Sequence, residues 1–285
     1  MKTPEQILSE YWGYNDFRPL QKEIISSILD GTDTLALLPT GGGKSVCFQV
    51  PALIREGVCL VISPLIALMQ DQVQRLKKLN IPAESIHSGL HHIDVRRILD
   101  NTINSGYKLL YVSPERLQTD LFRDYLEDME LSLIAIDEAH CISQWGHDFR
   151  PSYLKIADIR PMFPDVPVLA LTATATPDVQ QDIAVQLQLT KPAVFRQSFA
   201  RTNIHYGIRY SENKNGDTLS ALTKSSSIIY CRSRKQTEAV SRFLNQSGVA
   251  ATAYHAGMMR PVREKAQELW MNNTAPAMVA TTAFG

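Results

Sequence analysis

Short, continuous apolar runs alternate with amphipathic segments along most of the chain. The runs show no alternation of polar and apolar side chains, which is typical of strands buried on both faces of a parallel sheet. Between residues 34 and 196, strands are predicted at 34–38, 58–63, 109–112, 132–136 and 167–172. Helices are predicted at 44–54, 64–79, 91–104 and 177–187. The pattern therefore predicts an α/β fold built on a parallel sheet.

The two ends of the chain extend this pattern. Residues 4–12 carry apolar side chains at helical spacing before Gly13, and a second helix is predicted from Lys22 to Leu29. After a polar, turn-rich stretch at 196–218 the alternation restarts. Strands are predicted there at 227–230, 250–254 and 277–281, with helices at 234–246 and 262–272. We expect two domains, 1–200 and 201–285. Because the second has only about three strands, we expect the chain to be cut short.

A glycine-rich loop follows the first strand of the predicted sheet. Its sequence is Leu38-Pro39-Thr40-Gly41-Gly42-Gly43-Lys44-Ser45, and a helix is predicted directly after it. Glycines let successive backbone N–H groups point at one anion, and the helix N-terminus adds partial positive charge. Lys44 can reach the β- and γ-phosphates of a nucleotide, and Ser45 can hold Mg²⁺. The loop predicts a nucleotide-binding site, although Leu38 stands where the usual pattern has glycine.

Two adjacent carboxylates, Asp137 and Glu138, directly follow the run 132–136. In a parallel sheet the chemistry lies at the carboxyl ends of the strands, so the pair is expected beside the phosphate loop. Asp137 suits a Mg²⁺ ion held through water, and Glu138 suits orientation or deprotonation of an attacking water. A surface acidic turn is the alternative, but the position directly after a buried strand argues against it.

Tyr14, Arg18 and Gln21 lie between the two N-terminal helices. Tyr14 and Arg18 can sandwich a flat ring, and the Gln21 amide matches the hydrogen-bonding edge of adenine. Packing within a helical hairpin is the alternative explanation for Tyr14 and for Phe17. The phosphate loop about 20 residues later favours an adenine site.

Other strand ends also carry polar side chains. Ser63 and Ser113 each precede a proline, and each could grip a backbone phosphate or cap a helix; the sequence leaves both open. Thr172 and Thr174 could link the nucleotide site to another surface through hydrogen bonds, or form an ordinary turn. These motifs are weak by themselves.

Residues 141–150 form an unusual loop after the two carboxylates. Its aromatic and basic residues are Trp145, His147, Phe149 and Arg150. Aromatic rings and an arginine beside a hydrolytic site suit stacking on unpaired bases. A buried plug made of Trp145 and Phe149 is the alternative.

Composition narrows the function further. Hydrophobic residues make up 44% of the 285 residues and charged residues 20%, so a packed core is expected and disorder is not. Lys and Arg together number 29, as do Asp and Glu, so any nucleic-acid binding must come from local patches. Neither a signal peptide nor a membrane span is expected. The four cysteines, Cys47, Cys59, Cys141 and Cys231, are scattered, so we expect reduced cytosolic thiols and no zinc site.

These motifs, in this order, resemble the RecQ family of superfamily 2 helicases over essentially the whole chain. Tyr14, Phe17, Arg18 and Gln21 resemble its adenine-reading motif, and residues 39–45 resemble its phosphate loop, which tolerates a residue such as Leu38. Residues 137–140 resemble its DEAH box, followed by its aromatic-rich loop at 141–150. Further similar segments are 171–175, 230–234, 254–258 and 279–285.

The resemblance implies an ATP- and Mg²⁺-dependent motor with two RecA-like lobes, the second incomplete. Such a motor moves 3′ to 5′ on single-stranded DNA and unwinds forked duplex in DNA repair and recombination. The resemblance also assigns a catalytic role to His140 and DNA contacts to the aromatic loop, and it places the protein in the cytoplasm with the nucleoid. The family's arginine-finger segment would lie beyond Gly285, so we expect these 285 residues to bind ATP and DNA but to hydrolyse ATP slowly.

Three alternatives remain. An RNA helicase of the DEAH type shares several motifs, but the aromatic loop and the adenine motif count against it. A non-catalytic module that binds ATP and DNA is a second alternative. A phosphate-loop ATPase unrelated to nucleic acid is a third, and it would leave residues 145–150 without a function.

Overall fold

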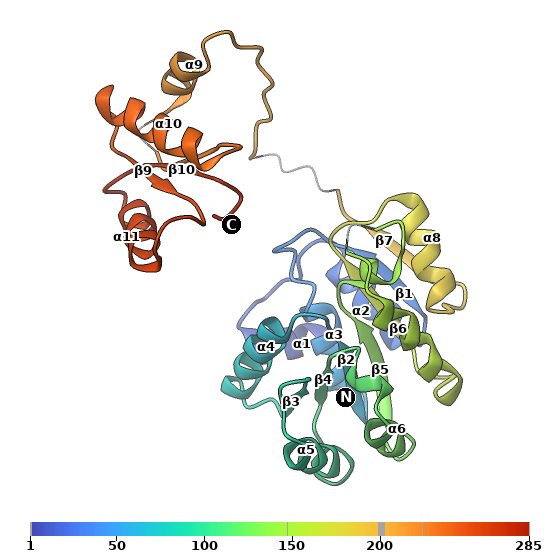
Figure 1. Cartoon of the computed structure of the whole chain (residues 1–285). Coiled ribbons are helices and arrows are strands. Elements are labelled where there is room, and N and C mark those ends of the chain that lie inside the picture. The colour runs from blue at the N-terminus through green and yellow to red at the C-terminus, as the bar shows by residue number, and fades with distance from the viewer. Residues whose placement is uncertain (1, 147, 199–202, 224, 285) are drawn as a thin grey trace. The chain divides into compact units, whose positions relative to one another are not determined.

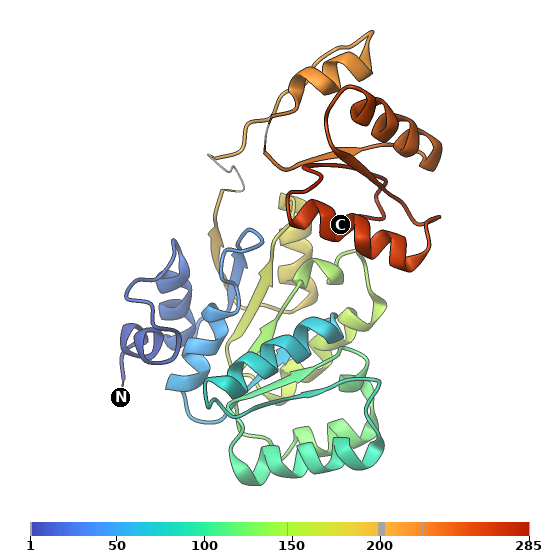
Figure 2. The same cartoon turned by 90° about the vertical axis from the view of Figure 1, so that its left-hand side faces the viewer.

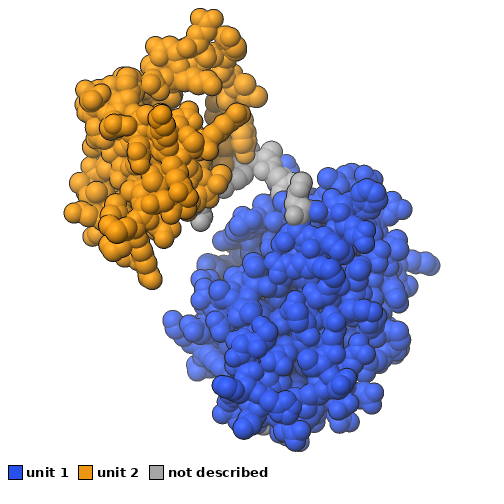
Figure 3. Space-filling view, viewed as in Figure 1, with its two compact units in different colours: residues 1–202 blue, residues 203–285 orange. Residues whose placement is uncertain are grey.

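The computed structural model describes residues 2–146, 148–198, 203–223 and 225–284. His147, one of the predicted DNA-binding residues, therefore lies outside the described residues. The chain divides into two compact units, residues 1–202 and 203–285, which are coloured separately in Figure 3. Each unit has its own sheet.

Unit 1 is built on a sheet of seven parallel strands in the order β3-β4-β2-β5-β6-β1-β7 (Figure 1). The strands are β1 Thr34–Leu37, β2 Val58–Ile62, β3 Ala83–Ile86, β4 Leu109–Val112, β5 Leu131–Ile136, β6 Val168–Thr172 and β7 Ala193–Arg196. The predicted parallel α/β sheet is confirmed. Strands β3 and β7, which the hydrophobic pattern does not predict, are the two edge strands. Each carries polar or half-exposed positions, because an edge strand has a neighbour on one side only.

Helices cover both faces of this sheet (Figures 1 and 2). They are α1 Pro4–Trp12, α2 Gln21–Leu29, α3 Val46–Ile54, α4 Ile66–Lys78, α5 His92–Ser105, α6 Asp120–Leu126, α7 Pro151–Leu154 and α8 Pro177–Gln186. Short 3₁₀ segments run over Arg116–Gln118, Ala139–Ile142 and Lys155–Met162. The layer of α2, α3 and α4 packs on one face, and the layer of α5 to α8 packs on the other.

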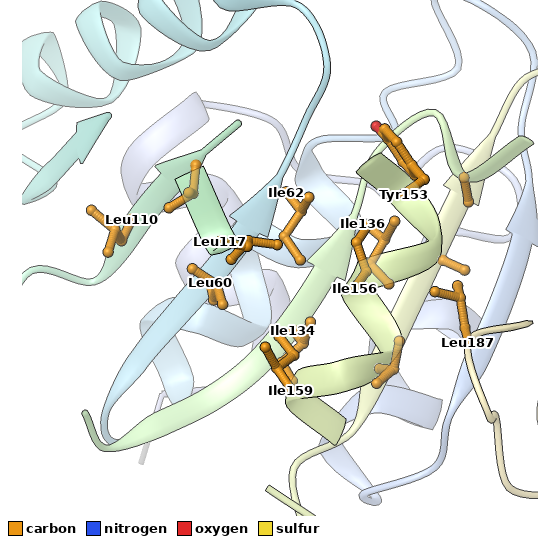
Figure 4. Packing of buried hydrophobic residues seen from close by; sticks show 14 of the residues in the cluster. Leu60, Ile62, Leu110, Leu117, Ile134, Ile136, Tyr153, Ile156, Ile159 and Leu187 are labelled. Atoms are coloured by element: carbon orange, nitrogen blue, oxygen red, sulfur yellow. The ribbon is translucent and has the colours of Figure 1, made fainter. Parts of the chain in front are cut away.

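The second layer shows how the core forms. Figure 4 shows Ile134 and Ile136 of β5 facing Ile156 and Ile159 of the 3₁₀ segment that follows α7. All four side chains are at most 3% exposed. Full burial of one such side chain contributes about 1.5–3 kcal/mol relative to exposure, so this contact holds the segment after the DEAH box onto the sheet.

The N-terminal helices show local sequence signals at work. Thr3 and Gln6 form a capping box at the start of α1, and Gly13 ends the helix in the left-handed conformation. Ile7 of α1, Ile25 of α2 and Val50 of α3 then share a small core. This core attaches the helical pair to the helix that follows the phosphate loop.

Unit 2 has the three strands expected from the sequence, and they form a parallel sheet in the order β8-β10-β9. Its elements are α9 Lys214–Ala221, β8 Ser227–Tyr230, α10 Arg234–Gln246, β9 Ala251–Tyr254, α11 Arg260–Met271 and β10 Ala277–Ala280. The central strand β10 is fully buried, whereas its two neighbours are partly exposed. Helix α9 was missed because its sequence is polar; the Asn213 side chain starts it by accepting a hydrogen bond from the Gly216 N–H at 3.1 Å.

Within the described part of the chain, no helix is both long and apolar enough to cross a bilayer.

Candidate nucleotide and nucleic-acid site

The strand order brings the predicted chemistry to one edge of the sheet. The phosphate loop follows β1, Asp137 follows β5 and Thr172 ends β6, which lies between those two strands. Backbone bonds from Leu38 to Thr172 (3.1 Å) and from Asp137 to Ile62 (2.9 Å) continue the ladders past the strand ends. The carboxyl ends of parallel strands therefore form a common platform for the site.

Glycine is required at the centre of the phosphate loop. Gly41 and Gly43 have φ angles of 79° and 77°, in the left-handed region that side chains disfavour. A Cβ on Gly42 would lie 2.8 Å from the Pro39 carbonyl oxygen, and a Cβ on Gly43 would overlap the Gln21 amide. The loop closes through a bond of 2.8 Å from the Gly42 N–H to the Pro39 oxygen.

Lys44 and the two carboxylates meet at this edge. Lys44 Nζ lies 3.4 Å from Glu138 Oε1, and both side chains are largely buried. Asp137 is 5% exposed, and burial, together with the neighbouring charge of Glu138, raises its carboxyl pKa to about 6. The positive charge of Lys44 lowers the pKa of Asp137. Lys44 also pairs with Glu138, however, so one lysine does not compensate the negative charge of both carboxylates. Such a pair favours a further cation.

His140 connects the carboxylates to the threonine motif. Its Nδ1 atom lies 2.8 Å from Thr172 Oγ1 and 3.3 Å from Glu138 Oε2. Burial lowers the pKa of the imidazole, so the neutral form with a proton on Nδ1 satisfies both neighbours. The Thr172 hydroxyl in turn contacts the Thr174 carbonyl and N–H groups, each at 3.2 Å. The arrangement joins the DEAH box to residues 172–174 through side-chain hydrogen bonds.

The predicted adenine residues pack directly on the phosphate loop. Gln21 donates to the Gly43 carbonyl at 3.0 Å and accepts from the Arg18 N–H at 2.9 Å, while Arg18 Nη1 donates to the Gly41 carbonyl. In this structure the Gln21 amide is thus bonded to the protein's own backbone. Tyr14 is 57% exposed, and a cavity of about 520 Å³ opens beside it. Tyr14, Arg18, Gln21, Gly43 and Ser45 all line this cavity, which joins the base-binding candidates to the phosphate loop.

The aromatic loop lies next to the same carboxylates. The Trp145 side chain is 79% exposed, so it is not part of a buried plug, and Phe149 is half-buried. Arg150 Nη1 donates to the Pro64 carbonyl at 3.2 Å, which ties this loop to the end of β2. The structure therefore brings Arg150 beside the Ser63 motif.

Ser63 and Ser113 lie deeper than a phosphate-gripping role suggests. Each is 2% exposed, and neither hydroxyl is aligned for a hydrogen bond with a described residue. The capping alternative does not hold either, since Leu65 and Glu115 occupy the cap positions of the following helices. Ser63 lies close enough to Asp137 to lower its pKa slightly, which is the smallest of the contributions to that carboxyl.

Sequence reasoning missed Tyr153. Its hydroxyl donates to the Asp137 carbonyl oxygen at 2.9 Å, and the whole side chain is buried. The bond fixes the turn between the two carboxylates, where Glu138 has a φ of 48°. A single tyrosine that follows a proline in a short helix has no spacing signal that would reveal this contact.

Comparisons with known proteins agree with this geometry. Residues 18–183 match the DEAD/DEAH box helicase family. The chain is 42% identical to the ATP-dependent DNA helicase RecQ of Haemophilus influenzae, over 99% of its own length and 46% of that protein. It is 41% identical to the ATP-dependent DNA helicase RecQ of Bacillus subtilis, over 99% of its own length and 48% of that protein. The chain thus spans about half the length of these relatives.

A solved structure supports the fold. Mycobacterium smegmatis helicase Lhr, bound to single-stranded DNA and AMP-PNP, superposes with a TM-score of 0.56 at 20% identity. That match covers 97% of this chain and 41% of Lhr, and it supports the RecA-like fold alone. From the family match, the chain belongs to the DEAD/DEAH box helicases, and it is similar to RecQ helicases over almost its whole length.

Proposed function

We propose that this chain acts as an ATP-driven motor that moves 3′ to 5′ along single-stranded DNA and separates forked duplex. Residues 1–200 would form its ATP-binding RecA-like lobe and residues 201–285 part of the second lobe. The observation that carries the proposal is that Lys44, Asp137 and Glu138 lie together at the carboxyl ends of the parallel strands. The exposed Trp145 lies on the loop that follows. Its place of work would be the nucleoid, in repair and recombination.

The residues present fit ATP and Mg²⁺. Asp137 is a buried carboxylate, and its raised pKa indicates that nearby positive groups do not fully compensate its negative charge. A divalent cation would supply the missing positive charge. Ser45 and Asp137 would hold Mg²⁺, and residues 40–45 would hold the phosphates. Tyr14, Arg18 and Gln21 would hold the base beside the cavity. The bound nucleotide supplies the phosphoanhydride whose hydrolysis drives the motor.

The chain's own residues would then act in turn. Lys44 leaves Glu138 for the phosphates, because the phosphate charge exceeds that of one carboxylate. Glu138, once released, orients and deprotonates the attacking water. His140 stays between Glu138 and Thr172. A change in the position or charge of the Glu138 carboxylate would therefore be transmitted to residues 172–174 through the imidazole ring.

For DNA, the surface around the aromatic loop is the candidate. Trp145 and Phe149 offer flat rings to unpaired bases, and Arg150 and His147 add basic groups to the same predicted contact set. Ser63, which was also predicted to contact DNA, is too deeply buried for this role. Arg150 donates a hydrogen bond to the Pro64 carbonyl, just after β2. A DNA strand bound to the aromatic loop would therefore also lie close to the end of β2.

Binding to single-stranded DNA tests this assignment. We would measure the anisotropy of a labelled DNA oligomer and of an RNA oligomer of the same sequence. Stacking contributes about 1–3 kcal/mol per base, so Trp145→Ala should weaken DNA binding about 5- to 150-fold, and Trp145→Phe should restore most of it. Equal binding of RNA by the unaltered chain would instead favour the DEAH-type RNA helicase.

A further inference from the structure

Three side chains of types that bind metals lie together at the start of the aromatic loop. They are His140, Cys141 and Asp148, whose candidate ligand atoms all lie within 4.8 Å of one another. Cys141 Sγ is 3.9 Å from His140 Nε2 and 3.8 Å from Asp148 Oδ2. Imidazole, thiolate and carboxylate are the donors that Zn²⁺ takes in proteins, and ligand atoms around one Zn²⁺ lie somewhat closer together than these. A small contraction of the loop would complete the set.

The backbone of the loop holds this group together. Arg150 N–H donates to the Cys141 carbonyl at 2.8 Å, so the chain returns to Cys141 after the loop. Gly146 makes the tight turn that allows this return, because a Cβ at that position would lie 2.9 Å from the His140 carbonyl oxygen. Asp148 is therefore held over Cys141 by the loop's own geometry.

The orientation of His140 is a second, independent observation. Its Nδ1 atom is already bonded to Thr172 Oγ1 and lies near Glu138 Oε2, at 2.8 and 3.3 Å. These partners assign the proton to Nδ1, which leaves the Nε2 lone pair facing Cys141. Histidines that bind metals are normally fixed in this way, with the other ring nitrogen donating to a carboxylate or similar group.

We propose that His140 Nε2, Cys141 Sγ and the Asp148 carboxylate bind a borderline-soft divalent cation such as Zn²⁺, with water as the fourth ligand. Binding forms a metal–sulfur bond and releases the Cys141 thiol proton to solvent. Arg150, 3.3 Å from Asp148, gives up that contact when the carboxylate turns to the metal. The bound ion ties the aromatic loop to the DEAH box and stops His140 from moving.

This site could not be found from cysteine spacing. The sequence has no paired cysteines, which is why we expected no zinc site. The ligands are instead two neighbouring residues and a third seven positions later, which only the folded loop brings together.

Cobalt spectroscopy tests the proposal without relying on motor activity. Co²⁺ reports a tetrahedral thiolate site through its d–d bands and a sulfur-to-metal charge-transfer band, so we would titrate it into the untagged, reduced 285-residue protein. We expect one Co²⁺ per chain, displaced by Zn²⁺. Cys141→Ser should abolish the charge-transfer band, and Cys231→Ser, in unit 2, should leave it unchanged.

Asp148 provides the decisive variant if Cys141→Ser fails to fold. Its side chain is 57% exposed, so Asp148→Asn should not disturb the core. Loss of a group that merely orients a ligand costs about 10–100-fold in metal affinity, so loss of this direct ligand should weaken Co²⁺ binding at least about tenfold. Absence of a thiolate band in the unaltered protein would overturn the proposal. A band that survives Cys141→Ser, or unchanged affinity in Asp148→Asn, would do the same.

Discussion

At the scale of single residues, Glu138 and the phosphates of a bound nucleotide would compete for Lys44. The lysine lies 3.4 Å from Glu138 Oε1, although both groups have separate tasks in the proposed chemistry. A phosphate that attracts Lys44 releases Glu138 at the same time. In the proposed mechanism, nucleotide binding and activation of the water-binding carboxylate would therefore be coupled through one ion pair.

Glu138→Gln separates these two effects. The variant keeps the size of the side chain but removes the base, so ATP turnover should fall about 100-fold or more. Affinity for Mg–ATP should hold or increase, because Lys44 loses its competing partner. Steady-state turnover and binding of a fluorescent ATP analogue measure the two quantities, with exposed Glu127→Gln as the matched control. Parallel losses of binding and turnover would contradict the coupling.

Asp137 makes the protein less stable at neutral pH. Its pKa is about 6 in the fold against 3.8 in the unfolded chain, so the native state holds the proton more tightly. The penalty is absent below about pH 4, grows as pH rises and is complete above about pH 6; two pKa units correspond to about 3 kcal/mol. In the absence of Mg²⁺ and nucleotide, Asp137→Asn should therefore be more stable than the unaltered protein at pH 7.5, by about 1–3 kcal/mol.

Urea unfolding at several pH values measures this difference. The advantage of the asparagine variant should shrink toward zero near pH 4, where Asp137 is protonated in both states. An advantage that does not change with pH would show that packing, rather than charge burial, is responsible.

At the scale of elements, the phosphate loop depends on contact with the N-terminal helices. Gly43→Ala combines an unfavourable left-handed backbone with a collision against Gln21. We expect at least a tenfold loss of nucleotide affinity, because Gln21 and Arg18 hold the loop through its carbonyls. Gly31→Ala is the control, since Gly31 has a similar φ of 78° and open space around it. Equal melting temperatures and equal nucleotide affinities for the two variants would contradict this role of Gln21.

The central elements were predictable and the edges were not. The buried strands β2 and β5 are runs of apolar residues interrupted only by Ser132 in β5, so their pattern is unambiguous. Strand β3 contains Glu84 and Ser85, and its pairing to β4 outweighs a weak local preference.

At the site, local motifs identified Lys44, Asp137 and Glu138, which the fold brings together. Tyr153 and the cluster of His140, Cys141 and Asp148 depend on the return of a loop, which no local pattern encodes.

At the scale of the whole molecule, unit 2 begins with a stretch without helix or strand at residues 203–212. Tyr206 and Tyr210 are 79% and 88% exposed there. Brief chymotrypsin treatment should therefore cut first at these two residues and release fragments close to units 1 and 2, because each unit has a separate core. Mass spectrometry of the fragments identifies the cuts, and a Tyr206→Ser, Tyr210→Ser double variant should resist them. Earlier cuts inside either unit would contradict this division.

The central claim is that Lys44, Asp137 and Glu138 form an ATP site that responds to DNA. The most direct measurement is ATP turnover by the 285-residue chain with and without single-stranded DNA, with Lys44→Ala as the blank. We predict a low rate that rises when DNA is added and that is absent in Lys44→Ala. A rate that is indifferent to DNA and unchanged by Lys44→Ala would contradict the account.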